Sequence, residues 1–275
     1  MAAINPQVSI IIVNYNTFEF TCKCVQSILE KTKGCSYEII VVDNASAEVA
    51  IKGINKLFPS VTLLESEVNL GFAKGNNMGI RYAKGDFILL LNSDAELQND
   101  AVSICLNFLR QEQLVAAVSG ALKYPDGRIQ HNCQRFPSIK YKLFELFRLQ
   151  KVFSRVRSGK MLLGFFFNHS EVVYPDWVWG TFFMFERKLL SLLPEQKLAD
   201  DFFMYVEDIQ WCMEFRKLGY SIAFQPAALV THHMGKSGGA KSVMIDENMN
   251  KFMEAYYSPW ERKLIKLLDR ILLKK

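Results

Sequence analysis

Apolar residues in the first hundred positions form short continuous runs that alternate with helical stripes. The run VSIIIV at 8–13 is rich in β-branched residues, which is typical of a buried parallel strand. From Phe18 to Thr32 apolar side chains recur in steps of three and four, and this spacing predicts a helix. The same alternation predicts strands at 37–43, 61–65 and 86–91 and helices around 47–58 and 74–84. We therefore expect an α/β fold with a doubly wound, mostly parallel sheet and helices on both faces.

Polar residues follow the ends of three of these strands. The clusters are Asn14-Tyr15-Asn16, Asp43-Asn44-Ala45-Ser46 and Asn92-Ser93-Asp94. Because ligands of open α/β sheets bind outside the carboxyl ends of the strands, these three clusters predict a ligand site at one edge of the sheet.

The second half of the chain is less regular. A strand at 115–120 leads to a turn at 124–127, where Pro, Asp and Gly follow one another. The basic and aromatic segment 138–175 is expected to form mobile helices or a flap over the site. Core-like sequence resumes at 177–185, and a helix with Glu207 and Asp208 is expected to end near Gly219.

The net charge of +5 is concentrated in two stretches. Seven basic residues and one Glu lie between Lys140 and Lys160, and six basic and two acidic residues lie between Pro259 and Lys275. A local excess of this kind indicates a specific anionic surface rather than nucleic acid. We expect a catalytic domain over 1–240 and a basic helical tail over 241–275.

The tail carries one apolar stripe on a helical wheel, made of Trp260, Leu264, Leu267 and Ile271. Its basic side chains point elsewhere: Arg262, Lys266, Arg270 and Lys274. Such a helix suits the interface of an anionic membrane, and a helix packed on the core would show the same pattern. The sequence contains no run of about 18 apolar residues, the length that a helix needs to span a membrane.

The six cysteines show neither a disulfide framework nor zinc spacing, so we expect a reducing compartment, the cytoplasm. The first residues predict a lead into a strand rather than a signal peptide. No GxGxxG follows the first strand and no GxxxxGK[ST] occurs, which argues against the dinucleotide-binding fold and the P-loop.

Six segments in one order carry a family resemblance: VSIIIVNYN, VVDNAS, NLGFAKGNNMGI, LLLNSDAEL, FFMYVEDIQWCMEFRKLGY and HHMGKS. Together, over roughly residues 8–240, they resemble the family 2 glycosyltransferases, and most closely the bacterial rhamnosyltransferase-like enzymes of O-antigen and cell-wall polysaccharide synthesis. The resemblance implies a GT-A fold and inverting transfer from a nucleotide-diphosphate sugar. The implied donor is dTDP-rhamnose, with a UDP-sugar second. The implied acceptor is a lipid-linked or polysaccharide hydroxyl at the inner face of the cytoplasmic membrane.

The resemblance also implies donor contacts. Asp43 would face the pyrimidine base, since a carboxylate accepts the N3–H of uracil or thymine. An aspartate that satisfies its own turn is the alternative. Glycines allow close approach of the backbone to a ligand, and the further donor-side candidates are Asn14, Asn16, Asn69, Gly71, Lys74, Asn76, Asn92 and Ser93.

A metal site is implied where the family carries its D-x-D motif, here Asn92-Ser93-Asp94. Mg²⁺ or Mn²⁺ prefers such oxygen ligands and would bridge the diphosphate of the donor. Because Asn92 replaces the first aspartate, Asp94 is expected to carry most of the contact and to hold the ion weakly without donor. His232, in an H-x-x-G-x-S arrangement with Gly235 and Ser237, is the second candidate. A structural role remains open for His232 and equally for its neighbour His233.

The pair Glu207-Asp208 matches the acidic pair that supplies the family's general base. We expect Asp208 to be the base and Glu207 to orient the acceptor or the base. Acidic residues at a helix start are also favoured by the helix dipole alone. Trp179, Gly180 and Thr181 are expected to line the acceptor side.

Two functions of other classes stay open beside this one. A nucleotidyltransferase would need a basic glycine-rich loop after the first strand, and the sequence has none there. A non-catalytic membrane-surface module descended from a transferase would not need Asp94 and Asp208, and the chain retains both.

Overall fold

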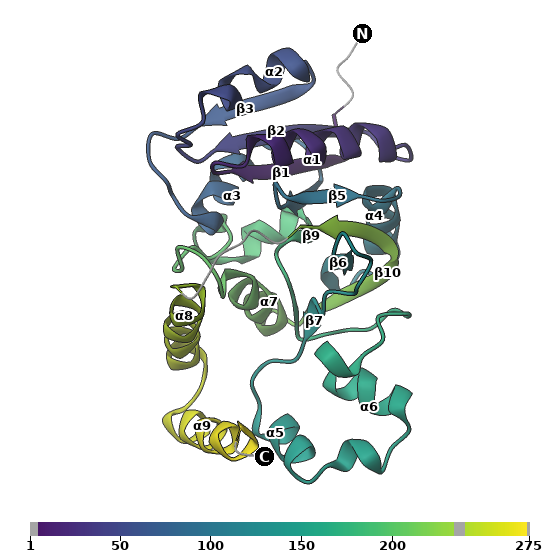
Figure 1. Ribbon diagram of the computed structural model, residues 1–275, viewed down its shortest axis with the longest axis vertical. Helices are drawn as coiled ribbons and strands as arrows, with labels where there is room; N and C mark the ends of the chain where they lie inside the picture. The colour runs from purple at the N-terminus through teal and green to yellow at the C-terminus, as the bar shows by residue number, and fades with distance from the viewer. Residues whose placement is uncertain (1–4, 234–239, 274–275) are drawn as a thin grey trace.

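The computed structural model describes residues 5–233 and 240–273 and contains, within them, an eight-stranded mixed sheet flanked by helices (Figure 1). Its strands are β1 (Val8–Asn14), β2 (Tyr37–Asp43), β3 (Val61–Glu65), β4 (Phe87–Leu91), β5 (Ala95–Leu97), β6 (Val115–Lys123), β9 (Phe182–Glu186) and β10 (Ser221–His232). The first three strands match the predicted ranges closely. In β1 and β2 most side chains are buried, as expected of central parallel strands, whereas in the edge strand β3 only Val61 is buried.

The strand order is β3-β2-β1-β4-β9-β6-β10-β5. Strands β1 to β4 pair in parallel, and so do β6 and β10. The mostly parallel sheet is therefore confirmed, but β9 runs antiparallel to both its neighbours and β5 runs antiparallel to β10. Apolar periodicity does not encode strand direction, so the sequence did not predict these reversals.

The helices are α1 (Phe18–Lys31), α2 (Ile54–Leu57), α3 (Phe72–Ile80), α4 (Ala101–Gln111), α5 (Ile139–Leu146), α6 (Arg155–Leu162), α7 (Glu207–Lys217), α8 (Ala240–Tyr256) and α9 (Pro259–Leu273). The helix predicted at 47–58 is in fact a 3-10 turn at Val49–Gly53 followed by the short α2. Gly53 lies at the junction, where a glycine weakens a helix. Helix α3 begins two residues before its predicted start, because Gly71 caps it with a positive φ of 80°.

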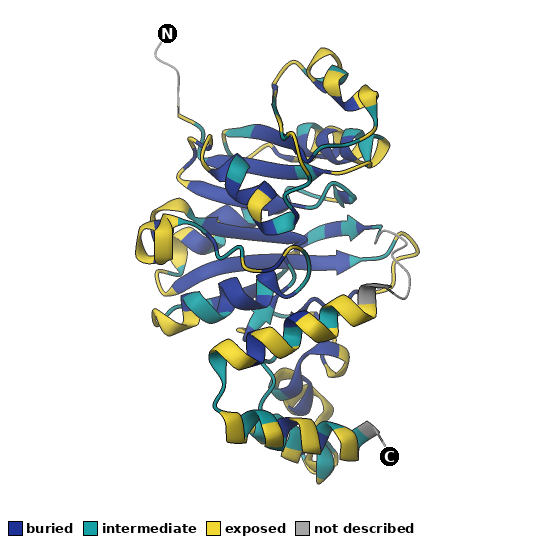
Figure 2. Cartoon of the chain, turned by 90° about the vertical axis from the view of Figure 1, so that its left-hand side faces the viewer, coloured by how far each residue is buried: buried dark blue, intermediate teal, exposed yellow. Residues whose placement is uncertain are grey.

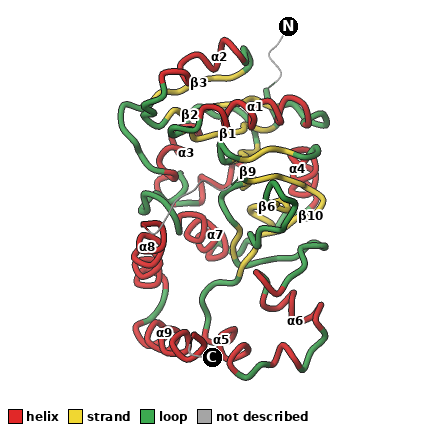
Figure 3. Tube along the Cα trace, in the orientation of Figure 1, coloured by secondary structure: helices red, strands yellow, loops and turns green. Residues whose placement is uncertain are grey.

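A two-stranded ribbon closes the base of the basic aromatic segment. Strands β7 (Cys133–Gln134) and β8 (Trp177–Val178) pair antiparallel, and the Asp176 N–H donates to the Gln134 carbonyl over 3.0 Å. The excursion between them consists mostly of helices and loops and lies beside α9 at the lower end of the molecule (Figures 1 and 3). Its role as a flap stays a prediction.

Helices α8 and α9 pack on different parts of the molecule. Phe252 and Met253 of α8 are buried against the segment from Phe202 to Ile209 that leads into α7. Helix α9 lies against α5, and Lys142 of α5 forms an ion pair with Asp269 over 2.6 Å.

The apolar stripe predicted for the tail is not the face that packs. Helix α9 buries Ile265 and Leu268, whereas Trp260, Leu267 and Ile271 stay exposed and Leu264 is half-buried. Figure 2 shows α9 at the lower end of the molecule, next to the C-terminus, with much of its surface exposed. Lys274 lies outside the described residues. No helix in the described ranges combines the length and apolar character needed to cross a bilayer.

Candidate active site

The ends of β1 and β2 meet as predicted. The parallel register places Asn14 opposite Asp43, and Asn14 Nδ2 donates to Asp43 Oδ1 over 3.1 Å and to Ser46 Oγ over 2.9 Å. Asn14 Oδ1 accepts the hydroxyls of Thr17 and Thr21. Asn14 is fully buried, so in this structure it fixes the Asp43 carboxylate.

The neighbouring loops are held by their own amides. Asn16 has a positive φ of 53° and its Oδ1 accepts the Ala47 N–H over 2.8 Å. Asn69 Oδ1 accepts from the Gly71 N–H, and Asn76 Nδ2 donates to the Phe72 carbonyl. These contacts shape the loops, whereas Lys74 is exposed on α3.

Asn44, which the sequence did not single out, connects two of these loops. Its Nδ2 donates to Asn69 Oδ1 over 2.9 Å, and its Oδ1 accepts the Leu70 N–H over 2.8 Å. A steric contact also explains why position 71 is a glycine. A Cβ there would lie 2.2 Å from the Phe203 carbonyl oxygen, which already accepts the Phe72 N–H over 2.8 Å. The loop before α7 therefore packs directly on the loop before α3.

Asp94 and His232 come together although 138 positions separate them. His232 pairs with Ala95 in the antiparallel β10–β5 register, so its ring reaches the residue before β5. His232 Nε2 lies 3.3 Å from Asp94 Oδ1 and 3.4 Å from Asn92 Nδ2. Ser93 Oγ hydrogen-bonds to Thr17 Oγ over 2.9 Å. The predicted metal residues thus form one group, although Gly235 and Ser237 of the same motif lie outside the described residues.

Gln130, which the sequence analysis missed, determines the state of the His232 ring. Gln130 Nε2 donates to the His232 carbonyl over 2.7 Å, so its Oε1, 2.8 Å from His232 Nδ1, must accept. The proton of the ring that Gln130 accepts is therefore on Nδ1, and Nε2 faces both Asp94 Oδ1 and the amide nitrogen of Asn92. Nothing in local sequence marks this contact, because 102 positions separate the two residues.

The donor atoms of this group fit a divalent cation. His232 Nε2 and Asp94 Oδ1 lie 3.3 Å apart, and Asn92 turns its amide nitrogen toward the same ring atom, while its Oδ1 is buried without a hydrogen-bond partner among the described residues. Oxygen and imidazole ligands suit Mg²⁺ or Mn²⁺. No group of three His, Cys, Asp or Glu side chains that could hold a metal ion occurs in the described part of the chain, so a cation held by Asp94 and His232 would gain a third protein ligand if the Asn92 amide turned its oxygen toward them.

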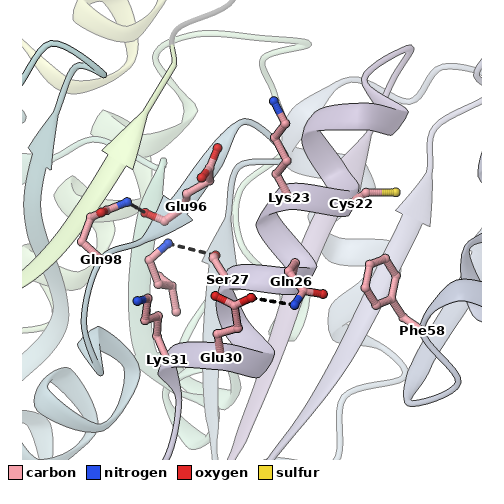
Figure 4. Close-up of a pocket in the computed structure, with 10 residues that line it drawn as sticks. Cys22, Lys23, Gln26, Ser27, Glu30, Lys31, Phe58, Glu96 and Gln98 are labelled. Carbon is pink, nitrogen blue, oxygen red and sulfur yellow. Dashed lines mark hydrogen bonds between the residues drawn. The ribbon is translucent and has the colours of Figure 1, made fainter.

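His233 does not join this group. Its Nε2 contacts Glu96 Oε1 over 2.7 Å, and its ring lies tilted against that of Phe20 with centroids 5.2 Å apart. Glu96 lines a separate cavity of about 460 Å³ beside α1 and β5 (Figure 4). The predicted site residues do not line this cavity.

A two-residue stretch connects the metal group to the acidic pair. Because β9 runs antiparallel to β4, the residues before β9 lie beside the residues after β4. The Asn92 N–H donates to the Thr181 carbonyl over 2.9 Å, and the Gly180 N–H donates to Asp208 Oδ2 over 3.0 Å. Trp179 is partly buried against the core. The predicted acceptor-side residues therefore lie between Asn92 and Asp208.

The acidic pair occupies the first turn of α7. Asp208 Oδ1 also accepts the Ile209 N–H over 2.9 Å. Burial raises the pKa of Asp208 to about 6. Burial, followed by the negative charge of Asp208, holds the pKa of Glu207 well above its usual range. Glu207 Oε2 has no hydrogen-bond partner in the described ranges. Perturbed carboxyl groups of this kind are typical of functional sites.

Comparison with known proteins places the chain in a family. The sequence model of Glycosyl transferase family 2 matches residues 9–172. Chondroitin synthase from Pasteurella multocida (strain Pm70) is 33% identical over 137 residues, which cover 48% of this chain and 14% of that protein. Poly(ribitol-phosphate) beta-glucosyltransferase from Bacillus spizizenii is 32% identical over 127 residues, covering 44% and 20%. The chain thus spans only a small part of these relatives.

Solved structures share the fold. GalNAc-T7, determined with UDP, GalNAc and Mn²⁺, superposes with a TM-score of 0.65 at 14% identity, over 91% of this chain and 48% of that one. The mannosyltransferase PcManGT from Pyrobaculum calidifontis, determined with GDP-Man and Mn²⁺, gives 0.63 at 19% identity, over 97% and 70%. From its sequence match over more than half its length and from this shared fold, the chain belongs to glycosyl transferase family 2.

Proposed function

We propose that this chain is an inverting, metal-dependent glycosyltransferase that moves L-rhamnose from dTDP-rhamnose to a hydroxyl of a lipid-linked or polysaccharide acceptor in bacterial cell-surface glycan synthesis. A UDP-sugar is the second candidate donor. The observation that carries the proposal is the Gly180-Thr181 stretch, which contacts Asp208 through one residue and Asn92 through the next. A base and a diphosphate site that are joined by two adjacent residues can act on one sugar bound between them.

On the donor side, Asp43 would accept the N3–H of thymine or uracil while Asn14 holds its other contacts in place. Asp94, His232 and Asn92 Oδ1 would hold Mg²⁺ or Mn²⁺. When bound, the cation offsets the charge that develops on the leaving diphosphate. Both solved relatives were determined with Mn²⁺, which supports the choice of ion.

The reaction is a single in-line displacement. The acceptor oxygen forms a bond to the anomeric carbon, the bond from that carbon to the diphosphate oxygen breaks, and Asp208 takes the hydroxyl proton. A carboxylate whose pKa lies near 6 is a stronger base than an exposed aspartate. Glu207 orients the acceptor or its neighbour and does not react.

A lipid-linked acceptor requires the enzyme to work at a membrane surface, and the exposed stripe of α9 provides one means. Trp260, Leu267 and Ile271 project from α9 beside basic residues of the same helix, among them Lys263, Lys266 and Arg270. Apolar side chains flanked by positive charge suit the inner, anionic face of the cytoplasmic membrane.

Paired substitutions test the function. Asp208→Asn preserves the size of the side chain but removes the base, so turnover should fall by about 10²–10⁴-fold. Donor affinity should stay near that of the wild type, since the donor contacts lie on Asp43 and Asp94. Glu207→Gln should have the milder effect, and Asp126→Asn, at an exposed turn far from the pair, is the matched control. If Asp208→Asn keeps most of its turnover, the base has been wrongly assigned.

A further inference from the structure

The backbone immediately before the acidic pair is held in an unfavourable conformation. Tyr205 and Val206 are consecutive residues with positive φ angles of 68° and 78°. A β-branched side chain such as that of Val206 rarely adopts this region, because its Cβ substituents crowd the backbone. Such residues persist only where surrounding contacts determine the conformation, and they cluster at functional sites.

One side chain from α8 supplies contacts of this kind. Asn248 Nδ2 donates to the Met204 carbonyl over 2.8 Å and to the Tyr205 carbonyl over 3.3 Å. These two carbonyls belong to the peptide planes on either side of Tyr205. Holding both planes fixes the φ and ψ angles of Tyr205, and these angles orient Val206, the N-cap residue from which α7 begins. Asn248 itself is only 8% exposed.

A second contact from α8 reaches the same helix one turn further along. The Tyr256 hydroxyl accepts from Gln210 Nε2 over 3.2 Å and donates to Glu214 Oε1 over 3.3 Å. The Lys217 ammonium lies 4.2 Å from the centroid of the Tyr256 ring. Helix α8 therefore holds both the turn before α7 and one face of α7 itself.

Helix α8 holds the start of α7 by apolar packing and by hydrogen bonds, and different side chains supply these two kinds of contact. Phe252 and Met253 supply its apolar packing against Val206 and Ile209, whereas the amide of Asn248 contacts backbone oxygens. Truncating Asn248 therefore leaves the apolar cluster in place and removes only the hydrogen bonds to the turn. This separation makes the role of Asn248 testable.

We propose that Asn248 is a positioning residue for sugar transfer: its amide fixes the left-handed turn at Tyr205-Val206, so that α7 begins with Asp208 against Gly180. Asn248 lies well beyond residues 9–172, which the family model matches. The inference rests on the proposed function to the extent that Asp208 is the base.

The kinetic test compares Asn248→Ala with Asn250→Ala, an exposed asparagine on the same helix. We expect Asn248→Ala to lower kcat by about 10–100-fold, since a small misplacement of a reacting group can cost this much. The KM for donor should stay within about twofold of the wild-type value, and Asn250→Ala should leave both constants unchanged. An unchanged kcat for Asn248→Ala, or a parallel change of kcat and KM, overturns the proposal.

Amide hydrogen exchange tests the same contact without relying on catalysis. The Gln210 N–H is bonded to the Val206 carbonyl in the first turn of α7, whereas the Leu218 N–H is bonded to Glu214 at its far end. Asn248→Ala should speed exchange at Gln210 and leave Leu218 unchanged. Equal exchange at Gln210 in both proteins overturns the proposal. If Asn248→Ala does not fold, Asn248→Leu retains the volume without the donors and should give the same pattern.

The two measurements also separate this inference from the proposed function. If Asp208→Asn remains active, the assignment of the base fails, and faster exchange at Gln210 still shows that Asn248 holds the turn. If Asp208→Asn is inactive while Asn248→Ala has wild-type kcat, the function stands and the inference is wrong.

Discussion

The Gly180 N–H donates to Asp208 Oδ2 over 3.0 Å, and the space that a side chain at Gly180 would need is limited by the ring of Phe72. A Cβ there would lie 3.2 Å from Phe72 Cε1 and 3.5 Å from the Cβ of Asp208. The contact with Asp208 would be an ordinary van der Waals contact, whereas the contact with Phe72 would require the ring to move by a few tenths of an ångström.

Gly180→Ala should therefore press on Phe72 and shift the backbone N–H that donates to Asp208, and a misplacement of this kind should lower turnover by about tenfold. The free energy of unfolding should fall by about 1–3 kcal/mol, the usual cost of overpacking. Gly53→Ala is the control, since a Cβ at Gly53 meets nothing within 4 Å. Steady-state kinetics and thermal unfolding of both variants are the measurements. Wild-type turnover in Gly180→Ala would show that the contact with Asp208 tolerates displacement.

Activity and stability should depend on pH in opposite ways around Asp208. As the base, it works when ionised, so kcat should rise with pH through the pKa of about 6. Burial raises this pKa above its ordinary value of 3.8. The group therefore contributes stability that is fully present below about pH 4 and is lost as the pH rises through about 6.

Asp208→Asn cannot ionise and should gain stability relative to the wild type between pH 4 and pH 7. Thermal unfolding across this range measures the difference, with Asp126→Asn as control. The Asp126 carboxyl is exposed and its pKa is lowered by hydrogen bonds from Arg128, so that variant should show no such gain. A difference between wild type and Asp208→Asn that does not change with pH would contradict the buried, titrating carboxyl.

The metal group should bind its ion more tightly when Asn92 becomes an acid. Asn92→Asp adds a negatively charged oxygen next to Asp94 and restores the D-x-D pattern, so Mn²⁺ affinity without donor should rise by about tenfold or more. Gln130→Leu should act in the opposite direction, because it releases His232 from its tautomer, with an expected loss of about 10–100-fold. Mn²⁺ titration followed by electron paramagnetic resonance measures both.

The exposed Gln98 provides the control for that series, as Gln98→Leu should leave Mn²⁺ affinity unchanged. Equal Mn²⁺ affinity in wild type, Asn92→Asp and Gln130→Leu would exclude Asn92 and His232 as ligands. Activity that survives excess EDTA would remove the metal from the proposed reaction altogether.

The exposed stripe of α9 should mediate binding to anionic vesicles. Replacing Trp260, Leu267 and Ile271 together by serine should release the protein in a sedimentation assay and leave the unfolding temperature within about 2 °C, because none of the three is buried. High salt should weaken binding of the wild type as well. The control replaces Val49, Leu57 and Leu114, which are exposed on other elements. If both triple variants sediment equally with the vesicles, α9 is not the contact.

The sequence predicted the positions of elements in both halves, among them β6 and α7, but not the strand directions of the second half. Strands β1, β2 and β4 are buried apolar runs, and parallel strands joined by helices leave few arrangements open. The central antiparallel β9 has a similar apolar run, Phe182 to Phe185. Its direction depends on where the preceding excursion returns the chain, and no local pattern records that.

In the candidate site too, some residues could be predicted from the sequence and others could not. Residues that end strands, such as Asp43 and Asp94, could be found because strand order places them at one edge. Contacts between distant segments could not: Gln130 orients His232 and Asn248 holds Tyr205 through side chains that look ordinary in sequence. Asn14 was expected to touch the donor, and its amide is instead occupied by Asp43 and Ser46.

The ribbon of β7 and β8 has a consequence for how this protein can diversify. Its two strands lie side by side where the basic aromatic excursion leaves and rejoins the core, and Asp176 ties the junction further by accepting the Phe136 N–H over 3.0 Å. Further along the excursion, Leu163, Phe167 and Val173 are buried in the core, and Val173 forms a bridge to Phe224 of β10. The stretch between these two anchors that carries the exposed Phe147 and Val152 is therefore the part that can change in length while Gly180 and Thr181 keep their places. We expect insertions there to leave the catalytic edge intact.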